Sequence, residues 1–126
     1  MTRQENKTKI SENLNIKWMI RRDIPEALRI ESKSYEYPWC EEDFLRCLRQ
    51  RNCIGMVTEK EDKILGFMIY ELHKRKIYIL NLATHSDYRR QGVGSAMTNK
   101  LKNKLSSQRR TSIVHNLRET NLEGQL

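Results

Sequence analysis

Asp87-Tyr88-Arg89-Arg90-Gln91-Gly92-Val93-Gly94-Ser95 is the stretch that decides the fold, because it joins an apolar strand-like run, Ile77–Ala83, to a helix-like run, Ser95–Ser106. Its two glycines let the backbone turn without a Cβ, so that successive N–H groups converge on one anion at the first turn of a helix. The helix N-terminus adds about half a positive charge, and the two arginines add more. The stretch therefore predicts a cradle for a diphosphate.

The spacing of the glycines excludes two common phosphate-binding motifs. A Walker loop would continue with Lys-Ser or Lys-Thr after Gly94, and a dinucleotide-binding loop would need a third glycine at this spacing. A tight turn before a helix, with no ligand, is the alternative interpretation.

Three separated segments resemble one enzyme superfamily. Arg89–Gly94 resembles the acyl-CoA pyrophosphate motif of the Gcn5-related N-acetyltransferases, which is Gln or Arg, two residues, Gly, one residue, then Gly or Ala. Ile30-Glu31 together with Tyr37–Phe44, which contains Pro38-Trp39, resembles the segment between the first two helices of the RimI-type branch, the ribosomal-protein alanine N-acetyltransferases. Arg118-Glu119-Thr120-Asn121 resembles the Arg-x-x-Asn that follows the fifth strand of that branch. The resemblance covers about Ile16–Leu126.

The hydrophobic pattern predicts alternating strands and helices in the order β-α-α-β-β-β-α-β. This order is typical of an α/β (α+β) fold of the superfamily, with a mixed, mostly antiparallel sheet flanked by helices. The strands are expected at Ile16–Ile20, Cys53–Glu59, Ile64–Leu72, Ile77–Thr84 and Thr111–Leu117, and the helices from Asp23 to Ser34, at Glu41–Arg49 and from the glycines to Ser106.

Two of these elements rest on clear periodicity. Ile16, Trp18 and Ile20 alternate with more polar neighbours, as in a half-buried strand with one apolar face. Helical spacing places one apolar stripe on the helix after the glycines, namely Val93, Met97, Leu101 and Leu105.

Length and composition indicate one domain. The chain has 126 residues, 37% of them hydrophobic and 32% charged, which suffices for one modest core. We expect a flexible polar head at 1–15 and a single, incomplete N-acetyltransferase domain at 16–126. No apolar run reaches the roughly 18 residues of a membrane span, so we expect a cytoplasmic protein that does not bind membranes. Cys40, Cys47 and Cys53 lack zinc-site spacing, which predicts free thiols and no metal.

The positive charge is concentrated near the cradle. The formal net charge is +8, and residues 89–110 contain seven basic residues and no acidic ones. This field would attract the phosphates of CoA, and RNA as readily. Because no aromatic platform motif accompanies the charge, we do not expect nucleic acid as the main partner. A solvated helix face is the alternative for Lys100, Lys102 and Lys104.

The resemblance implies acetyl transfer from acetyl-CoA, as cosubstrate, to a protein N-terminal amine, with a ribosomal protein as the type of acceptor. In the family the pantetheine arm binds the backbone of the fourth strand, and the glycine loop holds the diphosphate. Carried over to this chain, the implied cofactor-binding residues are Leu82, Ala83, Thr84, Arg89, Arg90, Gln91, Gly92, Val93, Gly94, Ser95 and Asn121.

The catalytic position departs from the family. Asn116 stands where the RimI-type branch carries its glutamate base, and an amide cannot accept a proton at neutral pH. His115, whose unperturbed pKa is about 6.5, is one replacement. Glu119, Glu71 and a water molecule relayed by Asn116 are others, and the sequence does not choose among them.

The end of the chain is the second departure. The family continues past the Asn121 position into a helix with a tyrosine and two more strands, whereas this chain ends at Leu126. We expect a shortened product, with a swapped homodimer as one alternative. A further alternative is a catalytically impaired acyl-CoA-binding or ribosome-associated module. The Pro-Trp segment lines the peptide side in the family, so Tyr35, Glu36, Tyr37 and Trp39 are candidates to frame an incoming N-terminus; the other interpretation is that Trp39 and Phe44 anchor a helix.

Overall fold

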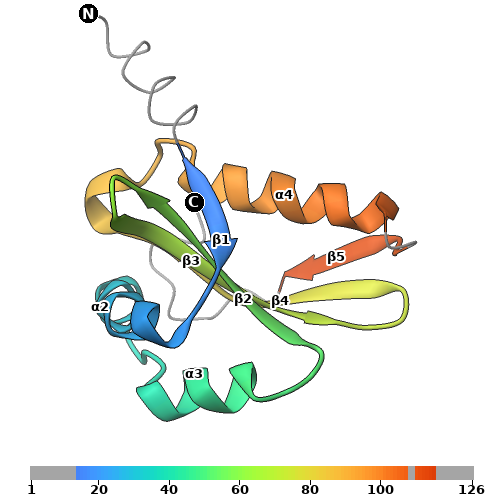
Figure 1. Cartoon of the computed structure of the whole chain (residues 1–126), viewed down its shortest axis with the longest axis horizontal. Coiled ribbons are helices and arrows are strands. Elements are labelled where there is room, and N and C mark those ends of the chain that lie inside the picture. Colours follow the sequence, from blue (N-terminus) through green and yellow to red (C-terminus); the bar gives the residue numbers. More distant parts are fainter. Residues whose placement is uncertain (1–13, 108–109, 116–126) are drawn as a thin grey trace, which may run out of the picture.

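The elements follow the predicted order in the computed structural model, which describes residues 14–107 and 110–115 (Figure 1). The elements are β1 (Asn15–Trp18), α2 (Ile24–Ser34), α3 (Glu41–Leu48), β2 (Cys53–Lys60), β3 (Lys63–Leu72), β4 (Lys76–Thr84), α4 (Val93–Ser107) and β5 (Ser112–His115), with 3-10 turns η1 (Arg21–Asp23) and η2 (Ser86–Tyr88). The expected polar head lies outside the described residues except for its last two positions, and Asn15 belongs to β1 instead.

The strands form one five-stranded sheet in the order β1-β2-β3-β4-β5. Each of β1 to β3 pairs antiparallel with the next strand, and β5 pairs parallel with β4. A parallel pair needs a crossover connection, and α4 supplies it. The mixed, mostly antiparallel sheet flanked by helices confirms the predicted fold class.

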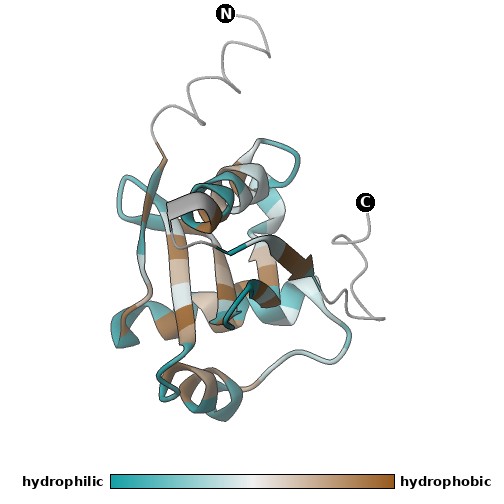
Figure 2. Cartoon of the chain, turned by 90° about the vertical axis from the view of Figure 1, so that its right-hand side faces the viewer, coloured by the Kyte–Doolittle hydropathy of each residue, from teal (hydrophilic) through white to brown (hydrophobic). Residues whose placement is uncertain are grey.

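The helices cover the sheet from both sides, with α2 and α3 on one face and α4 on the other (Figure 1). Under α2 and α3, the core centres on Phe44 and Phe67, whose rings meet edge to face at 5.3 Å. Under α4 it includes Met97 and Leu101, both fully buried, as the predicted stripe requires. Figure 2 shows the hydrophobic colour running along the strands between the two helical layers.

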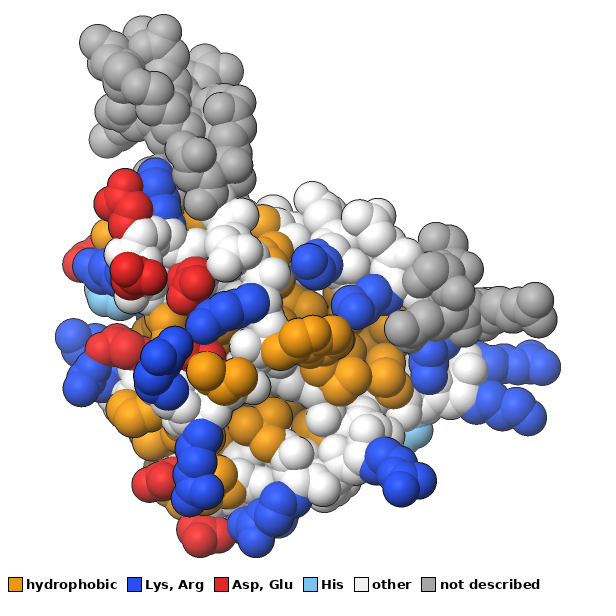
Figure 3. Space-filling model, in the orientation of Figure 1, with side chains coloured by type: hydrophobic (Ala, Val, Ile, Leu, Met, Phe, Trp, Pro, Cys, Tyr) orange, Lys and Arg blue, Asp and Glu red, His pale blue; other side chains and the backbone are white. Residues whose placement is uncertain are grey.

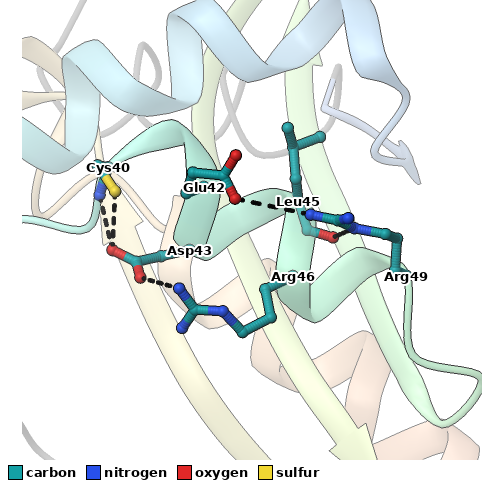
Figure 4. Close-up of polar contacts among 6 residues, drawn as sticks. All are labelled: Cys40, Glu42, Asp43, Leu45, Arg46 and Arg49. Carbon is teal, nitrogen blue, oxygen red and sulfur yellow. Dashed lines mark hydrogen bonds and ion pairs between the residues drawn. The ribbon is translucent and has the colours of Figure 1, made fainter.

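Helix α3 has polar contacts at both of its ends (Figure 4). The Asp43 carboxylate accepts hydrogen bonds from the Cys40 backbone N–H at 2.9 Å and from the Cys40 thiol at 3.3 Å, which satisfies donors at the start of the helix. Arg46 pairs with Asp43 at 3.3 Å, and Arg49 pairs with Glu42 at 3.7 Å. Because these ion pairs are exposed, each contributes about 0.5 kcal/mol or less to the stability of the fold.

The turn between β2 and β3 has two residues with positive φ. Glu61 has φ 51° and Asp62 has φ 65°, as in the two-residue hairpin turns whose twist matches that of the strands. The charged connection between the two predicted strands is therefore a tight hairpin, as expected.

The exposed face of β1 corrects the sequence analysis. Trp18 is 56% exposed and Ile20 is 46% exposed, whereas Met19, which falls between them, is 9% exposed and packs in the core under α2 and α3. The alternating pattern indicated a strand correctly, and Ile16 is partly buried on the α4 side, but Trp18 and Ile20 are exposed. The reason is that α4 packs mainly on β3 and β4 and reaches Trp18 through the Lys104 side chain.

The start of α2 also differs in detail. Asp23 occupies the N-cap position, but its carboxylate does not bond the first turn of α2. Instead it accepts a hydrogen bond from the Ile20 N–H at 2.9 Å and contacts the Lys17 ammonium at 3.7 Å. The carboxylate thus fixes the turn that leads from β1 into the helix.

The three cysteines are free thiols, as predicted. Burial raises the pKa of Cys53 to about 12 and raises that of Cys47 as well, so both stay protonated at neutral pH. In the described part of the chain, no three His, Cys, Asp or Glu side chains gather as metal ligands would. None of the described helices combines the length and the apolar character that a membrane crossing requires.

Candidate functional site

The loop between η2 and α4 turns through two residues in the left-handed region. Arg90 has φ 63° and Gly92 has φ 90°. Glycine adopts such a φ without cost, whereas a residue with a Cβ is strained there. The first helical hydrogen bond of α4 runs from the Ala96 N–H to the Gly92 carbonyl at 2.9 Å. The loop therefore delivers the chain into the helix within three residues.

The first turn of α4 leaves backbone donors for a ligand. The amides of Val93, Gly94 and Ser95 precede the first helical hydrogen bond, so no carbonyl of α4 can accept from them. A Cβ placed on Gly94 would meet only the Thr84 hydroxyl, at 3.8 Å, so space is open in front of this turn. Donors at a helix N-terminus with open space before them fit an anionic group such as a diphosphate.

Arg89 holds this loop to the rest of the fold. Its Nε donates to the Thr84 carbonyl at 3.2 Å, and its Nη2 donates to the Ser34 hydroxyl at 2.9 Å. The guanidinium thus ties the loop to the end of β4 and to the end of α2. Gln91 folds back and donates to the Asp87 carbonyl at 3.1 Å. Arg90 is exposed, so of the two predicted arginines it is the one placed toward solvent.

Residues 14–107 and 110–115 leave a gap beside the second half of β4. The parallel pairing with β5 runs from Lys76 opposite Ser112 to Ile79 opposite His115. Among the described residues, no strand pairs with the following part of β4 on that side. This part contains the predicted residues Leu82, Ala83 and Thr84, and it leads directly to the glycine loop. The structure therefore brings these predicted residues together along one line.

The ladder between β3 and β4 contains a β-bulge at Leu80. Tyr70 lies opposite Ile79, but Ile69 lies opposite Asn81, so Leu80 is an extra residue in the ladder. Ile79 and Leu82 both pack on the α4 side, which strict alternation forbids. A bulge bends the strand and ends regular pairing. This bulge falls directly after Ile79, the last residue of β4 that pairs with the described part of β5.

The edge of β4 that faces the gap presents amide donors. The Leu82 carbonyl accepts from the Tyr35 hydroxyl, and the Thr84 carbonyl accepts from Arg89, so both carbonyls point away from β3. In a strand the N–H and the C=O of one residue point to the same side, which directs the Leu82 and Thr84 amides to the gap as well. The N–H and C=O groups of Ala83 point to β3, as does the His85 N–H, which donates to the Leu65 carbonyl.

A buried carboxylate supports this edge from behind. Glu31 is fully buried, and it accepts from the Trp39 N–H at 2.7 Å and from the Asn81 side-chain amide at 2.8 Å. Within residues 14–107 and 110–115, the Asn81 Oδ1 is buried without a hydrogen-bond partner. The sequence analysis gave Glu31 and Asn81 no role. A signal was present, because Glu31 falls on the buried face of α2 together with Ile24, Ala27 and Ser34.

The candidate bases are only partly within the described residues. Asn116, Glu119 and Asn121 lie outside them. His115 is the last described residue of β5 and lies opposite Ile79, and desolvation lowers the pKa of its imidazole below the ordinary value of 6.5. Glu71 contacts His73 and lies opposite Tyr78, about 13 Å along the strand from Leu82. The geometry therefore places His115, and not Glu71, beside the gap.

The Pro-Trp segment divides into an anchored part and an exposed part. Trp39 meets Phe44 edge to face at 5.5 Å, and both belong to the core under α2 and α3. The interpretation that these two rings anchor α3 is thus confirmed. Glu36 and Tyr37 are exposed, the latter at 69%, while Tyr35 is buried with its hydroxyl on β4.

Comparison with known proteins gives a family and several relatives. Residues 19–122 match the sequence model of the Acetyltransferase (GNAT) family. The ribosomal protein bS18-alanine N-acetyltransferase of Escherichia coli (strain K12) is 30% identical over 83 residues, which are 66% of this chain and 55% of that protein. The chain therefore spans about half the length of the curated relatives that it matches.

Solved structures share the fold. The ribosomal-protein-S18-alanine N-acetyltransferase from Escherichia coli has a TM-score of 0.78 at 23% identity and covers 89% of this chain and 72% of its own. Ard1 from Thermoplasma volcanium also has a TM-score of 0.78 at 23% identity, over 90% and 77% of the two chains. An aminoglycoside acetyltransferase, meta-AAC0020, from an uncultured soil metagenomic sample has a TM-score of 0.68 at 19% identity, over 87% and 81%. At these identities the likeness concerns the fold alone.

Proposed function

The chain belongs to the Acetyltransferase (GNAT) family, and from this premise we propose that it transfers the acetyl group of acetyl-CoA to the N-terminal amine of a protein. The proposed acceptor class is a ribosomal protein. The support is that the curated relatives are named as acetyltransferases of a ribosomal-protein alanine.

One observation carries the proposal. The gap beside Leu82–Thr84 leads directly to the helix N-terminus at Val93–Ser95, so backbone donors for an amide-containing arm and for a diphosphate follow each other along the chain. An acyl-CoA molecule has these two parts in that order. The residues that would hold it are the amides of Leu82 and Thr84 and those of the first turn of α4.

The chain must also prepare the acceptor amine, which is an ammonium ion at neutral pH. It has to lose a proton before it can attack the thioester, and a base must take that proton. With an amide at position 116, we propose that the proton leaves through His115 or through water. The low pKa of His115 keeps its imidazole neutral at pH 7, and therefore able to accept a proton.

Calorimetric titration of the full chain with acetyl-CoA at physiological salt tests the binding step. Saturable binding at micromolar strength, about 8 kcal/mol, is expected. Transfer is then measured by mass spectrometry on a peptide with a free N-terminal alanine. The same peptide with a blocked N-terminus is the matched control. A folded chain that binds no acetyl-CoA would contradict the proposal.

Two substitutions locate the base. Asn116→Glu is expected to raise the transfer rate at saturating acetyl-CoA, since it restores a carboxylate at the position where the similar family has one. His115→Asn is expected to lower the rate and to remove its rise between pH 5 and 7. If neither variant changes the rate or the pH profile, the proton leaves by a route that involves neither position.

A second candidate function is an acyl-CoA-binding module without catalysis. The observation that favours it is the amide at position 116. It predicts acetyl-CoA binding of the same strength with no transfer to any peptide, including in the Asn116→Glu variant. Restored transfer in that variant would exclude a purely binding role for the fold.

A further inference from the structure

A shallow groove lies on the α4 side of the sheet, next to the edge strand β1, at a distance from the gap. It encloses about 200 Å³ and is lined by Ile16, Lys17, Trp18, Met56, Lys100 and Lys104. Figure 3 views this face and shows hydrophobic side chains at its centre with Lys and Arg side chains around them. The groove forms because α4 covers β3 and β4 and leaves β1 open.

The lining combines an exposed indole with positive charge. Trp18 is 56% exposed, and the Lys104 ammonium lies 4.8 Å from its ring centroid. Lys17 contributes little net charge, because it contacts Asp23 at 3.7 Å and Glu59 at 3.5 Å. Lys100 and Lys104 add two further ammonium groups, and α4 contains no acidic residue between Val93 and Ser107.

The two lysines follow one side of the helix. Positions four apart on a helix have Cβ atoms about 5–6 Å from each other, so the two ammonium groups form a short positive row beside the indole. The sequence analysis found the basic residues of α4 but no aromatic platform to accompany them. The fold supplies that platform from β1, more than 80 residues earlier in the chain.

We propose that this groove binds a single-stranded nucleic acid, with a base stacked on Trp18 and the phosphates beside Lys100 and Lys104. Sites for single strands combine an aromatic ring, on which any base can stack, with a positively charged track for the backbone. The lining complements the negative charge of the phosphates, because it includes lysines and no carboxylate. The enclosed volume is below the roughly 300–1,000 Å³ of pockets for drug-sized ligands, which suits one planar ring at a time.

An acidic peptide is the competing partner, and the lining favours it less. None of the six lining side chains carries a strong acceptor for peptide N–H groups, and only the lysine ammonium groups and the Trp18 indole N–H can donate to peptide carbonyls, whereas stacking of a base on the indole requires no hydrogen bond. The groove is also separate from the cradle. Lys100 lies six residues along α4 from Gly94, about 9 Å along the helix axis. The proposal therefore does not rest on acetyl transfer.

Fluorescence anisotropy with labelled ten-nucleotide oligouridine and oligothymidine tests the proposal on the full chain. Saturable binding of either oligonucleotide at physiological salt is expected. Trp18→Ala should weaken it about tenfold or more, and Trp18→Phe should retain most of it, since a smaller ring still stacks. The Phe variant also guards against a loss caused by misfolding, which circular dichroism checks in each variant.

The charge is tested by salt dependence. The double variant Lys100→Ala/Lys104→Ala should reduce the slope of log affinity against log salt by about 1.4, as expected for two contacts to a single strand. Lys102→Ala is the matched control, because Lys102 is exposed on the same helix but does not line the groove; it should change the slope by less than half as much.

Several results would overturn the proposal. These are equal binding by the wild type and Trp18→Ala, and equal affinity for a duplex of the same length, which indicates diffuse attraction. Displacement by an acidic decapeptide that contains phenylalanine would assign the groove to a peptide. Displacement by CoA would assign it to the cofactor site. A dimer that Trp18→Ala dissociates would assign it to a second copy of the chain. Loss of acetyl-CoA binding alone leaves this proposal intact, so the two fail independently.

Discussion

The two sites that we propose lie along α4 and are built from different parts of the chain. At the N-terminal end, backbone amides, a turn with positive φ at Gly92 and the bulged edge of β4 form the cradle. Farther along, the groove consists of side chains that lie on the surface around Trp18. A site made of main chain depends on backbone shape and spacing, whereas a site made of side chains depends on residue identity. Substitutions should therefore affect the two sites in opposite ways.

The largest expected effect comes from Gly92→Glu. It forces a residue with a Cβ to φ 90° and brings a carboxylate toward the diphosphate, so acetyl-CoA affinity should fall about a thousandfold or more, about 4 kcal/mol. Lys102→Glu, which changes charge more but leaves the backbone alone, should weaken binding only a few-fold. Titration calorimetry measures both. Equal losses would mean that diffuse charge, and not the cradle, binds the cofactor.

Glu31→Ala is expected to have the next largest effect, this time on stability. The Trp39 N–H and the Asn81 amide would both lose a buried acceptor, and the free energy of unfolding should fall by about 3 kcal/mol. Urea unfolding followed by circular dichroism measures it. Glu36→Ala, an exposed carboxylate five residues later, is the control and should change stability by less than about 0.5 kcal/mol. A loss as small as that of the control would show that the carboxylate does not support β4.

Arg89→Lys separates shape from charge within the cradle. The ammonium keeps the charge but cannot bond the Thr84 carbonyl and the Ser34 hydroxyl together as the guanidinium fork does. Acetyl-CoA affinity should fall about tenfold, because the loop is no longer held. Arg90→Lys, at an exposed neighbour, should be tolerated. If both lysine variants bind equally well, the arginine contributes only its charge, and the contrast between the two sites weakens.

Among these changes in stability, that of His115→Asn should be the smallest, and it should depend on pH. The folded pKa of this imidazole lies below 6.5, so the unfolded chain binds more protons than the folded chain below that pH, and stability falls as the pH drops from 6.5 through the folded pKa. The variant should lose that part of the pH dependence, a difference in Tm of about 1–2 °C. Thermal melts of both proteins at pH 5 and 8 measure it. If both proteins show the same difference in Tm between the two pH values, the imidazole of His115 is as exposed to water as the side chains of the groove.

The sequence predicted what local patterns control. The end of α2 before Pro38, the hairpin at Glu61 and Asp62 and the stripe on α4 all depend on residues within a few positions of one another. The cradle was predicted for the same reason, since two glycines before a helix define it locally. The resemblance to the family supplied the fold class and the order of strands.

The remaining features depend on contacts between distant segments. Trp18 was expected on a half-buried strand, but its exposure is decided by where α4 crosses the sheet. Arg89 was expected to contact the cofactor, and its bonds to Thr84 and Ser34 join segments that local patterns do not relate. Glu31 and Asn81 are 50 residues apart. Asn116 and Asn121 remain predictions from the resemblance.

The extra residue at Leu80 has a genetic consequence. Its side chain is an ordinary apolar one, so exchange for another apolar residue would leave β4 largely as it is and a substitution screen would pass over it. Deleting the codon for this extra residue would place Asn81 directly after Ile79 in a regular ladder, so that Asn81 and Leu82 would keep their faces and their partners Glu31 and Tyr35. A deletion scan should therefore find that β4 tolerates the loss of one residue at this position, although a strand normally does not.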